Sequence, residues 1–123
     1  EAAQRLLNEA ARYLGTPYVW GGYSPSGFDC SGFVSYCLTH SGVRNTGRLT
    51  AQGLYDICTP VSQSEAQPGD LIFFTGTYDA GVPVTHIGIY VGNGQMIHCG
   101  HPVQYTSINS PYWQSHFYGF GRW

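Results

Sequence analysis

Residues 15–36 of this chain read GTPYVWGGYSPSGFDCSGFVSY, and Cys30 is the chemical centre of this stretch. A loop rich in glycine and aromatic residues precedes Asp29, and an apolar helical pattern begins at Phe33 and Val34. Asp29 suits the N-cap position, because its carboxylate can accept hydrogen bonds from the free N–H groups of the first turn. Cys30 is therefore expected at the positive end of a helix, where a neighbouring imidazole helps to lower a thiol pKa from about 8.5 to roughly 3.5–7.5. Such a thiol is suited to act as a nucleophile, and a buried structural cysteine is the alternative at this point.

Length and composition indicate one domain without a strong charge. The chain has 123 residues, enough for a single core, and its formal net charge is −2. The sequence contains 17 glycines, which suggest tight turns, and 10 tyrosines, which suggest a groove with polar aromatic walls. It shows no basic patch and no apolar run of about 20 residues, so we expect neither nucleic acid as a partner nor a membrane span. Because the chain starts at Glu1, we expect residues 1–123 to be one domain of a longer protein whose targeting segment is not in this chain.

The four cysteines do not suggest a disulfide framework. They stand at positions 30, 37, 58 and 99, and their spacing matches no zinc-ribbon pattern. If Cys30 is a nucleophile, the other three cannot all pair with one another. Cys37 and Cys58 are therefore interpreted as small apolar core residues.

The expected elements run from helices to short strands. Helices are expected over residues 1–14, 30–40 and 50–57, the last with Thr50 as N-cap. Strands are expected over residues 71–74, 85–91, 95–99, 103–108 and 117–123. Residues 18–28, 60–67, 75–83 and 111–116 are expected to be loops or irregular. This order predicts an α+β fold with an antiparallel sheet.

A cysteine nucleophile needs a base, and the base needs a polar group that orients it. His86 opens a strand whose alternation puts His86 and Gly88 on one face, and His98 lies on the returning strand. A two-residue turn at Asn93 and Gly94 would put His98 on the opposite face. A three-residue loop, or a bulge of equal effect, would instead place His98 diagonal to His86, roughly 7–8 Å away. If the two histidines act together, we predict the second geometry.

The other histidines are given no catalytic role. His40 lies in the last turn of a helix, and His116 follows a proline-rich loop. His98, Cys99 and His101 form a competing metal-site hypothesis, but neighbouring residues of a strand point to opposite faces, so His98 and Cys99 should diverge. We therefore expect no metal and no cofactor.

Several short motifs follow one another along the chain. They are YVWGG at residues 18–22, DCSG at 29–32, RLTAQ at 48–52, PGDLIFF at 68–74, HIGIYVGNG at 86–94 and MIH at 96–98. Together they resemble the motifs of the NlpC/P60 family of cell-wall cysteine peptidases, in the family's order and over nearly the whole chain. Two departures are small, since Thr85 precedes His86 and Leu49 follows the family arginine, and neither removes a catalytic group.

The resemblance implies a papain-like α+β fold, in which a helix that carries the nucleophile packs on an antiparallel sheet. By position, Cys30 would be the nucleophile, His86 the base and His98 the residue that orients His86. The implied substrate is a peptidoglycan stem peptide, cut between D-isoglutamate and the diaminopimelate or lysine that follows. The resemblance also implies a secreted or wall-associated bacterial protein, with this monomeric domain similar to the C-terminal peptidase domain of bifunctional wall hydrolases.

The same resemblance implies four substrate-binding residues. Tyr18 would lie beside the nucleophile and help to hold the oxyanion, Asp29 and Ser31 would bind the free amine of the stem peptide, and Arg48 would face the substrate. Asp29 would then have two competing uses, as helix cap and as substrate ligand.

Two alternatives to the endopeptidase stay open. Thioacyl chemistry on the same fold can serve an amidase or an acyltransferase, because a thioacyl intermediate accepts other nucleophiles. The same groove could also bind wall peptide without cutting it, although the intact set of Cys30, His86 and His98 argues against such a binding module.

Overall fold

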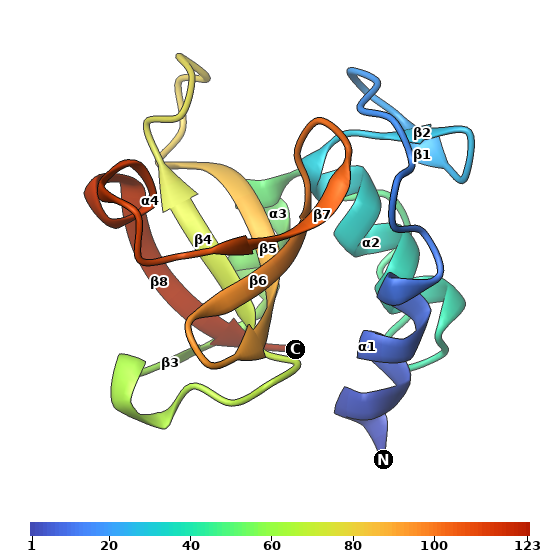
Figure 1. The fold of residues 1–123 in the computed structure, drawn as a ribbon, viewed down its shortest axis with the longest axis horizontal. Coiled ribbons are helices and arrows are strands. Elements are labelled where there is room, and N and C mark those ends of the chain that lie inside the picture. The colour runs from blue at the N-terminus through green and yellow to red at the C-terminus, as the bar shows by residue number, and fades with distance from the viewer.

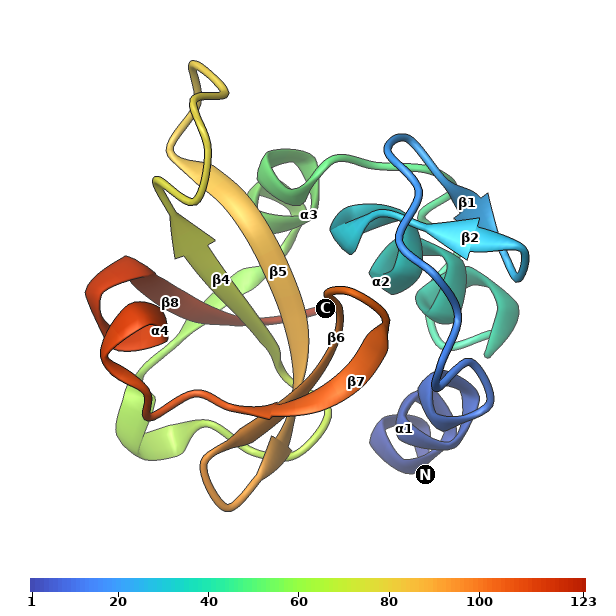
Figure 2. The ribbon, with the colours of Figure 1, turned by 45° about the horizontal axis from the view of Figure 1, so that its top comes forward.

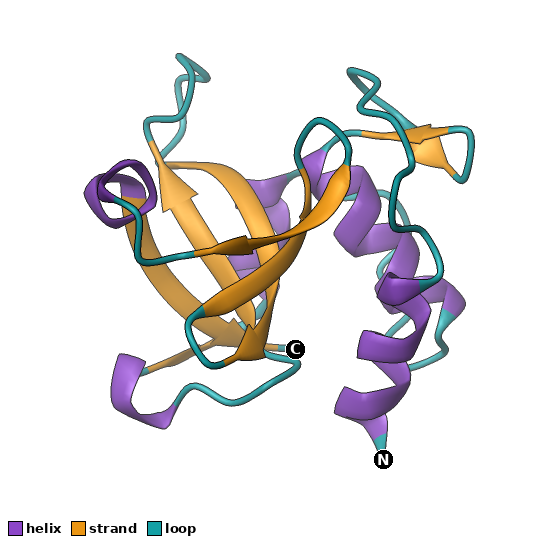
Figure 3. Ribbon diagram, viewed as in Figure 1, coloured by secondary structure: helices purple, strands orange, loops and turns teal.

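The computed structural model describes residues 1–123 and places a group of helices beside a curved antiparallel sheet (Figures 1 and 3). The helices are α1 (Ala2–Ala11), α2 (Cys30–His40), α3 (Ala51–Ile57) and α4 (Pro111–His116), with a short 3₁₀ helix, η1, at Gln63–Glu65. A small hairpin consists of β1 (Tyr23–Ser24) and β2 (Gly27–Phe28). The main sheet consists of β3 (Thr59–Val61), β4 (Leu71–Thr75), β5 (Val84–Gly92), β6 (Gln95–Cys99), β7 (Val103–Ser107) and β8 (Phe117–Arg122). Its strand order is β3-β8-β4-β5-β6-β7 with antiparallel pairing throughout, so the predicted α+β fold is confirmed.

Both faces of the sheet are covered. On one face, α2 packs against β5 and β6 while α1 packs against α2, and the large core between them is built from apolar residues such as Phe33, Leu38, Ile87 and Ile89. On the other face, a smaller core contains Phe74, Met96 and Phe120 with two more buried side chains, and Trp113 of α4 packs against it. Burying an apolar side chain of this size contributes roughly 1.5–3 kcal/mol, so α2 is held firmly against β5.

Helix α2 begins where the sequence predicts. Asp29 is the N-cap, and its side chain accepts a hydrogen bond from the N–H of Gly32 at 2.7 Å. Thr50 likewise caps α3, as expected, by accepting from the N–H of Gly53 at 3.0 Å. The first of these caps fixes Cys30 as the first residue of α2.

The connection between β5 and β6 contains a bulge, one of the two geometries predicted to place His98 on the same face as His86. Gly92 pairs with Gln95 around a two-residue turn, but Tyr90 pairs with Met96, so the register shifts by one residue between them. This bulge has the same effect as the three-residue loop considered above. It turns His98 to the face of the sheet that carries the histidine of β5, and that prediction is confirmed in its bulge form.

Several local predictions are wrong. Residues 111–116 form α4 rather than an irregular segment, because Ser110 caps a helix that has Pro111 in its first turn. The expected loops at 60–67 and 18–28 contain, respectively, η1 with part of β3 and the β1–β2 hairpin. Helix α1 ends at Ala11 rather than Leu14, since the chain turns there and Leu14 stays 45% exposed.

The lengths of the helices set one further limit. The longest, α2, has 11 residues, and none is long and apolar enough to cross a bilayer.

The four cysteines are free thiols: Cys37 is buried as expected, whereas Cys58 is only partly buried at the edge of the large core.

Candidate active site

The thiol of Cys30 faces the backbone of β5. Its Sγ lies 3.8 Å from the carbonyl oxygen of Thr85, the residue before the histidine of that strand. Burial, followed by the charge of Asp29, raises the pKa of the Cys30 thiol to about 11, although hydrogen bonds from the backbone at Ser31 and Ile87 act in the opposite direction. The expected lowering of this pKa is therefore wrong for the site at rest. A dry environment disfavours the thiolate more than the helix end and the backbone N–H groups favour it.

A series of three polar side chains lies on β5, β6 and β7. Nε2 of His86 lies 2.9 Å from Nδ1 of His98, and Nε2 of His98 lies 2.9 Å from Oγ1 of Thr106. Burial, with a smaller effect from His98, lowers the pKa of His86 to about 3, and burial lowers that of His98 to about 4. Both rings are therefore neutral near pH 7. The structure brings the two histidines together as the sequence predicts.

Gly88 makes room for this pair. A Cβ at Gly88 would lie 3.2 Å from Cβ of His98 and 2.8 Å from the sulfur of Met96. Any larger residue there would push the neighbouring strand, and with it His98, away from His86.

An aromatic wall covers the histidines. Trp113 stacks on His86, with ring centroids 5.1 Å apart and an angle of 28° between the planes. It meets His98 edge-on at 5.4 Å and Phe74 at 4.7 Å. Helix α4 thus places one indole over both imidazoles and shields their hydrogen bond from water.

Two residues of this arrangement were not identified from the sequence. Trp113 lies in α4, and the sequence does contain a start signal for that helix, because Ser110 followed by Pro111 is a typical N-cap and first helical position. Thr106 had no such signal. It pairs with Met96, two residues before His98 on the same face, so its place beside His98 follows only from the pairing of β6 with β7.

Asp29 is the centre of a polar cluster beside Cys30. One carboxylate oxygen, Oδ1, caps α2, while Oδ2 accepts from the N–H of Gly21 at 3.0 Å and from Arg48 at 2.7 Å. Arg48 also donates to Oγ of Ser31 at 2.9 Å, and that hydroxyl donates to Oδ1 of Asp29 at 3.3 Å. The cluster joins three of the four residues that were expected to bind substrate, and Asp29 caps α2 through Oδ1 while Oδ2 contacts Gly21 and Arg48.

Tyr18 lies at the same site. Its ring packs on His101 with centroids 4.7 Å apart. Burial and then the nearby Cys30 raise the pKa of Tyr18 to about 12, so the phenol remains a proton donor at neutral pH.

A cavity of about 580 Å³ joins these groups, a size within the roughly 300–1,000 Å³ of ligand pockets. Its lining includes Tyr18, Asp29, Cys30, Ser31 and Arg48, and on the far side residues of α3 and of the 75–83 loop. Trp20 and Tyr78 meet edge to face at 5.6 Å across it. Figure 2 shows the loop before β1 and the loop between β4 and β5 rising on the same side of the molecule.

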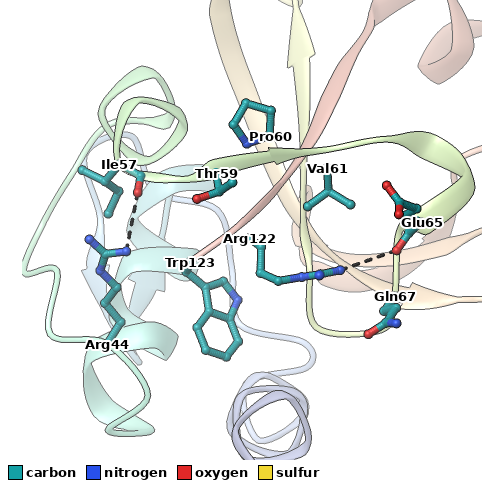
Figure 4. Close-up of a pocket in the computed structure, with 9 residues that line it drawn as sticks. All are labelled: Arg44, Ile57, Thr59, Pro60, Val61, Glu65, Gln67, Arg122 and Trp123. Carbon is teal, nitrogen blue, oxygen red and sulfur yellow. Dashed lines mark hydrogen bonds between the residues drawn. The ribbon is translucent and has the colours of Figure 1, made fainter.

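A second cavity, of about 610 Å³, lies at the other end of the sheet (Figure 4). It is lined by Arg44, Ile57, Thr59, Pro60, Val61, Glu65, Gln67, Arg122 and Trp123, and contains neither cysteine nor histidine. Arg122 is occupied by Asp70, with contacts of 2.7 and 2.8 Å. Because this second cavity has no cysteine, whereas Cys30 lines the first, the cavity beside Cys30 is the candidate active site.

The competing metal hypothesis is not supported by side-chain directions. His98 points to His86, whereas Sγ of Cys99 donates to the carbonyl oxygen of Phe28 at 3.2 Å, on the other side of β6. The two neighbours diverge, as strand geometry requires.

Fold and site together define a papain-like α+β domain, with a cysteine at a helix N-terminus and a histidine pair on the adjoining sheet. The sequence model of the NlpC/P60 family matches residues 15–122, and the chain belongs to that family. It is 44% identical over 121 residues to the bifunctional muramidase/DL-endopeptidase CwlT of Bacillus subtilis, covering 97% of this chain and 36% of CwlT. It is 48% identical over 118 residues to the probable endopeptidase p60 of Listeria seeligeri, covering 95% of this chain and 21% of p60.

A solved structure of the family is also similar. It is the NLP/P60-family protein of Staphylococcus aureus that is described as similar to lipoprotein. The two structures superimpose with a TM-score of 0.92 at 43% identity, over 98% of this chain and 41% of the staphylococcal chain. The chain therefore spans only part of the length of CwlT, of p60 and of the staphylococcal protein.

Proposed function

We propose that this domain is a peptidoglycan endopeptidase of the cysteine type. The observation that carries the proposal is the placement of Cys30 against β5, the strand whose His86 is hydrogen-bonded to His98. Support comes from the family, because CwlT and p60 are both named as endopeptidases. The bond cut would join D-isoglutamate to the diaminopimelate or lysine of a stem peptide.

The mechanism follows from which ring nitrogen is free. Nε2 of His86 is occupied by His98, so Nδ1 is the nitrogen that accepts the proton of Cys30. The thiol and the imidazole are both neutral at rest, because burial raises the pKa of Cys30 and lowers that of His86. The proton therefore moves as the sulfur attacks the carbonyl carbon. His86 then protonates the leaving amine, and a water activated by His86 hydrolyses the thioacyl enzyme.

The cavity supplies the remaining contacts. The backbone N–H of Cys30 and the phenol of Tyr18 would donate to the oxyanion, and losing one such donor typically costs roughly 10²–10³ in rate. Asp29, Ser31 and Arg48 would hold the free amine and the backbone of the stem peptide. Trp20 and Tyr78 would cover the bound peptide.

The decisive experiment is digestion of purified muropeptides that contain either diaminopimelate or lysine, read by mass spectrometry. We compare wild type with Cys30→Ala, and with Cys58→Ala as a control cysteine outside the cavity. We expect fragments ending in D-isoglutamate from wild type and Cys58→Ala alone.

Other outcomes would replace the proposal. Fragments joined to an added amine would indicate an acyltransferase, and a cut at an amide outside the peptide chain would indicate an amidase. If neither wild type nor Cys30→Ala cleaves but both bind muropeptide in calorimetry, the domain is a binding module.

A wall substrate also sets the place of action. We propose a secreted or wall-associated bacterial protein, in which residues 1–123 act as one monomeric catalytic domain of a longer chain. Cell fractionation of the full-length protein and sedimentation of the domain test the two statements separately.

A further inference from the structure

The polar series on the sheet does not end at the second histidine. Nε2 of His98 lies 2.9 Å from Oγ1 of Thr106, a residue of β7. His98 is only 4% exposed, and Thr106 is the one hydrogen-bond partner that its Nε2 has. We propose that Thr106 is a positioning residue, which holds His98, and through it His86, in the tautomer that the reaction needs. This inference rests on the proposed function.

Each hydrogen bond in the series holds one proton, so the position of one proton fixes the others. A neutral His86 that accepts a proton at Nδ1 must carry its own proton on Nε2. That N–H then donates to Nδ1 of His98, so the proton of His98 stands on Nε2 and must donate to an acceptor. Oγ1 of Thr106 is in place to accept it.

The opposite arrangement would be inactive. If Nδ1 of His98 donates to Nε2 of His86, the proton of His86 stands on Nδ1, the nitrogen to which the proposed mechanism transfers the proton of Cys30. The ring then cannot take the proton of Cys30. The protonated His86 that forms during attack also needs an acceptor for the proton of His98. Its Nε2–H donates to Nδ1 of His98, so the proton of His98 again stands on Nε2 and donates to Thr106.

The geometry of β7 makes Thr106 specific for this task. Thr106 pairs with Met96, so its side chain lies diagonal to His98 on the same face of the sheet. Trp113 meets the edge of the His98 ring at 5.4 Å. Removing the hydroxyl would leave the buried Nε2–H of His98 without an acceptor, whereas moving the proton to Nδ1 would leave only the Nε2 lone pair unpaired, which costs less.

The test uses Thr106→Val, which keeps the β-branched shape without the hydroxyl, and Thr106→Ser, which keeps the hydroxyl. Thr59→Val, an exposed threonine on β3, is the matched control. The first readout is the ¹⁵N chemical shift of the histidine ring nitrogens at pH 7. We expect Nε2–H on His86 and His98 in wild type, Thr106→Ser and Thr59→Val, and a shift toward Nδ1–H in Thr106→Val.

The second readout is kinetic. We expect kcat of Thr106→Val on muropeptides to fall at least about tenfold with KM unchanged, as is usual when an orienting partner is lost, and Thr106→Ser to retain activity. An unchanged tautomer and an unchanged kcat in Thr106→Val would overturn the inference. A rise in KM or a loss of folding stability with kcat unchanged would point to a structural role and overturn the inference.

The two readouts separate failure of this inference from failure of the proposed function. If wild type cleaves no muropeptide, the proposed function fails while the tautomer measurement still decides the role of Thr106. If Thr106→Val does not fold, Thr106→Ala removes the hydroxyl with a smaller side chain and is judged by the same shifts.

Discussion

At the scale of single residues, the site combines two groups that are both held in their neutral forms. Burial raises the pKa of Cys30 to about 11 and lowers that of His86 to about 3. Two backbone N–H groups, at Ser31 and Ile87, are nevertheless directed at the sulfur, where they stabilise negative charge that develops as the proton leaves. A neutral pair of this kind limits side reactions of the thiol while the cavity is empty.

The first prediction concerns the charge beside that thiol. Asp29→Asn keeps the N-cap, because asparagine caps as well as aspartate, but removes a charge that raises the pKa of Cys30. We expect alkylation of wild-type Cys30 by iodoacetamide to accelerate about tenfold per pH unit from pH 7 to 10 and that of Asp29→Asn to be faster at each pH. Peptide mapping identifies the alkylated cysteine, and Asp56→Asn, another carboxylate of the cavity, serves as control. A rate that levels off near pH 7 in wild type would mean that the thiolate exists at rest.

At the scale of elements, one bulge and one glycine decide whether the histidines meet. The register shift between Tyr90 and Gly92 brings His98 round to the face of His86, and Gly88 lets β6 approach closely enough. Neither feature is a catalytic group. Both set the 2.9 Å contact between the two rings.

Gly88→Ala tests this arrangement. The added Cβ would lie 2.8 Å from the sulfur of Met96 and 3.2 Å from Cβ of His98, so we expect a loss of about 1–3 kcal/mol of stability and of nearly all activity. Gly119→Ala on β8 is the matched control, since a Cβ there meets nothing within 4 Å. Urea unfolding and muropeptide cleavage measure the two effects. Full activity in Gly88→Ala would show that the strands can separate without cost to the site.

Helix α4 gives a second prediction at this scale. Trp113→Ala removes the indole that stacks on His86 at 5.1 Å. We expect a loss near the lower end of about 3–5 kcal/mol, because Trp113 is only partly buried, and a fall in kcat as water reaches the histidines. Tyr112→Ala, at a neighbouring residue that is 50% exposed, should change neither quantity much. Calorimetry measures the stability and steady-state kinetics the kcat. Equal effects of both variants would contradict a specific role for the indole of Trp113 at the histidines.

Features that lie within one element could be predicted from the sequence, whereas features that depend on contacts between elements could not. Patterns within one element, such as the N-cap at Asp29 and the apolar stripe of α2, predicted the helix and its cysteine correctly. Thr106 could not be found, because its role depends on the pairing of β6 with β7 rather than on local sequence. The pKa of Cys30 was expected to move in the wrong direction, since burial, the dominant cause, is a property of the packed structure.

At the scale of the whole molecule, the site is assembled from two parts of the fold. The helical part supplies Cys30 with Asp29 and Ser31, and the sheet supplies His86 and His98. The core between α2 and β5 holds the two parts together. Stability of the fold and competence of the site are therefore linked through the same buried groups.

That linkage predicts how stability depends on pH. Histidine titrates near about 6.5 in an unfolded chain, but at about 3 and 4 for His86 and His98 in the folded one. Between these values the unfolded chain binds more protons, so the free energy of unfolding falls as the pH falls from about 6.5. We expect a slope of up to about 1.4 kcal/mol per pH unit for each ring. Urea titrations from pH 7 to 4 measure it.

Two variants make the measurement specific. His98→Gln should flatten the slope, because it removes one of the buried rings, whereas His40→Gln, at an exposed histidine of α2, should leave the slope as in wild type. An equal slope in all three proteins would assign the acid sensitivity to other groups.

The position of β8 has a consequence for the life of the protein in the cell. This strand comes last in the chain, yet it lies between β3 and β4, and its Phe120 closes the smaller core under the histidines. A ribosome or a secretion channel delivers Cys30 long before it delivers this strand. The nascent domain therefore contains Cys30 before the support beneath His86 and His98 is complete. If the domain is the endopeptidase proposed above, it stays inactive during synthesis until β8 has emerged and folded.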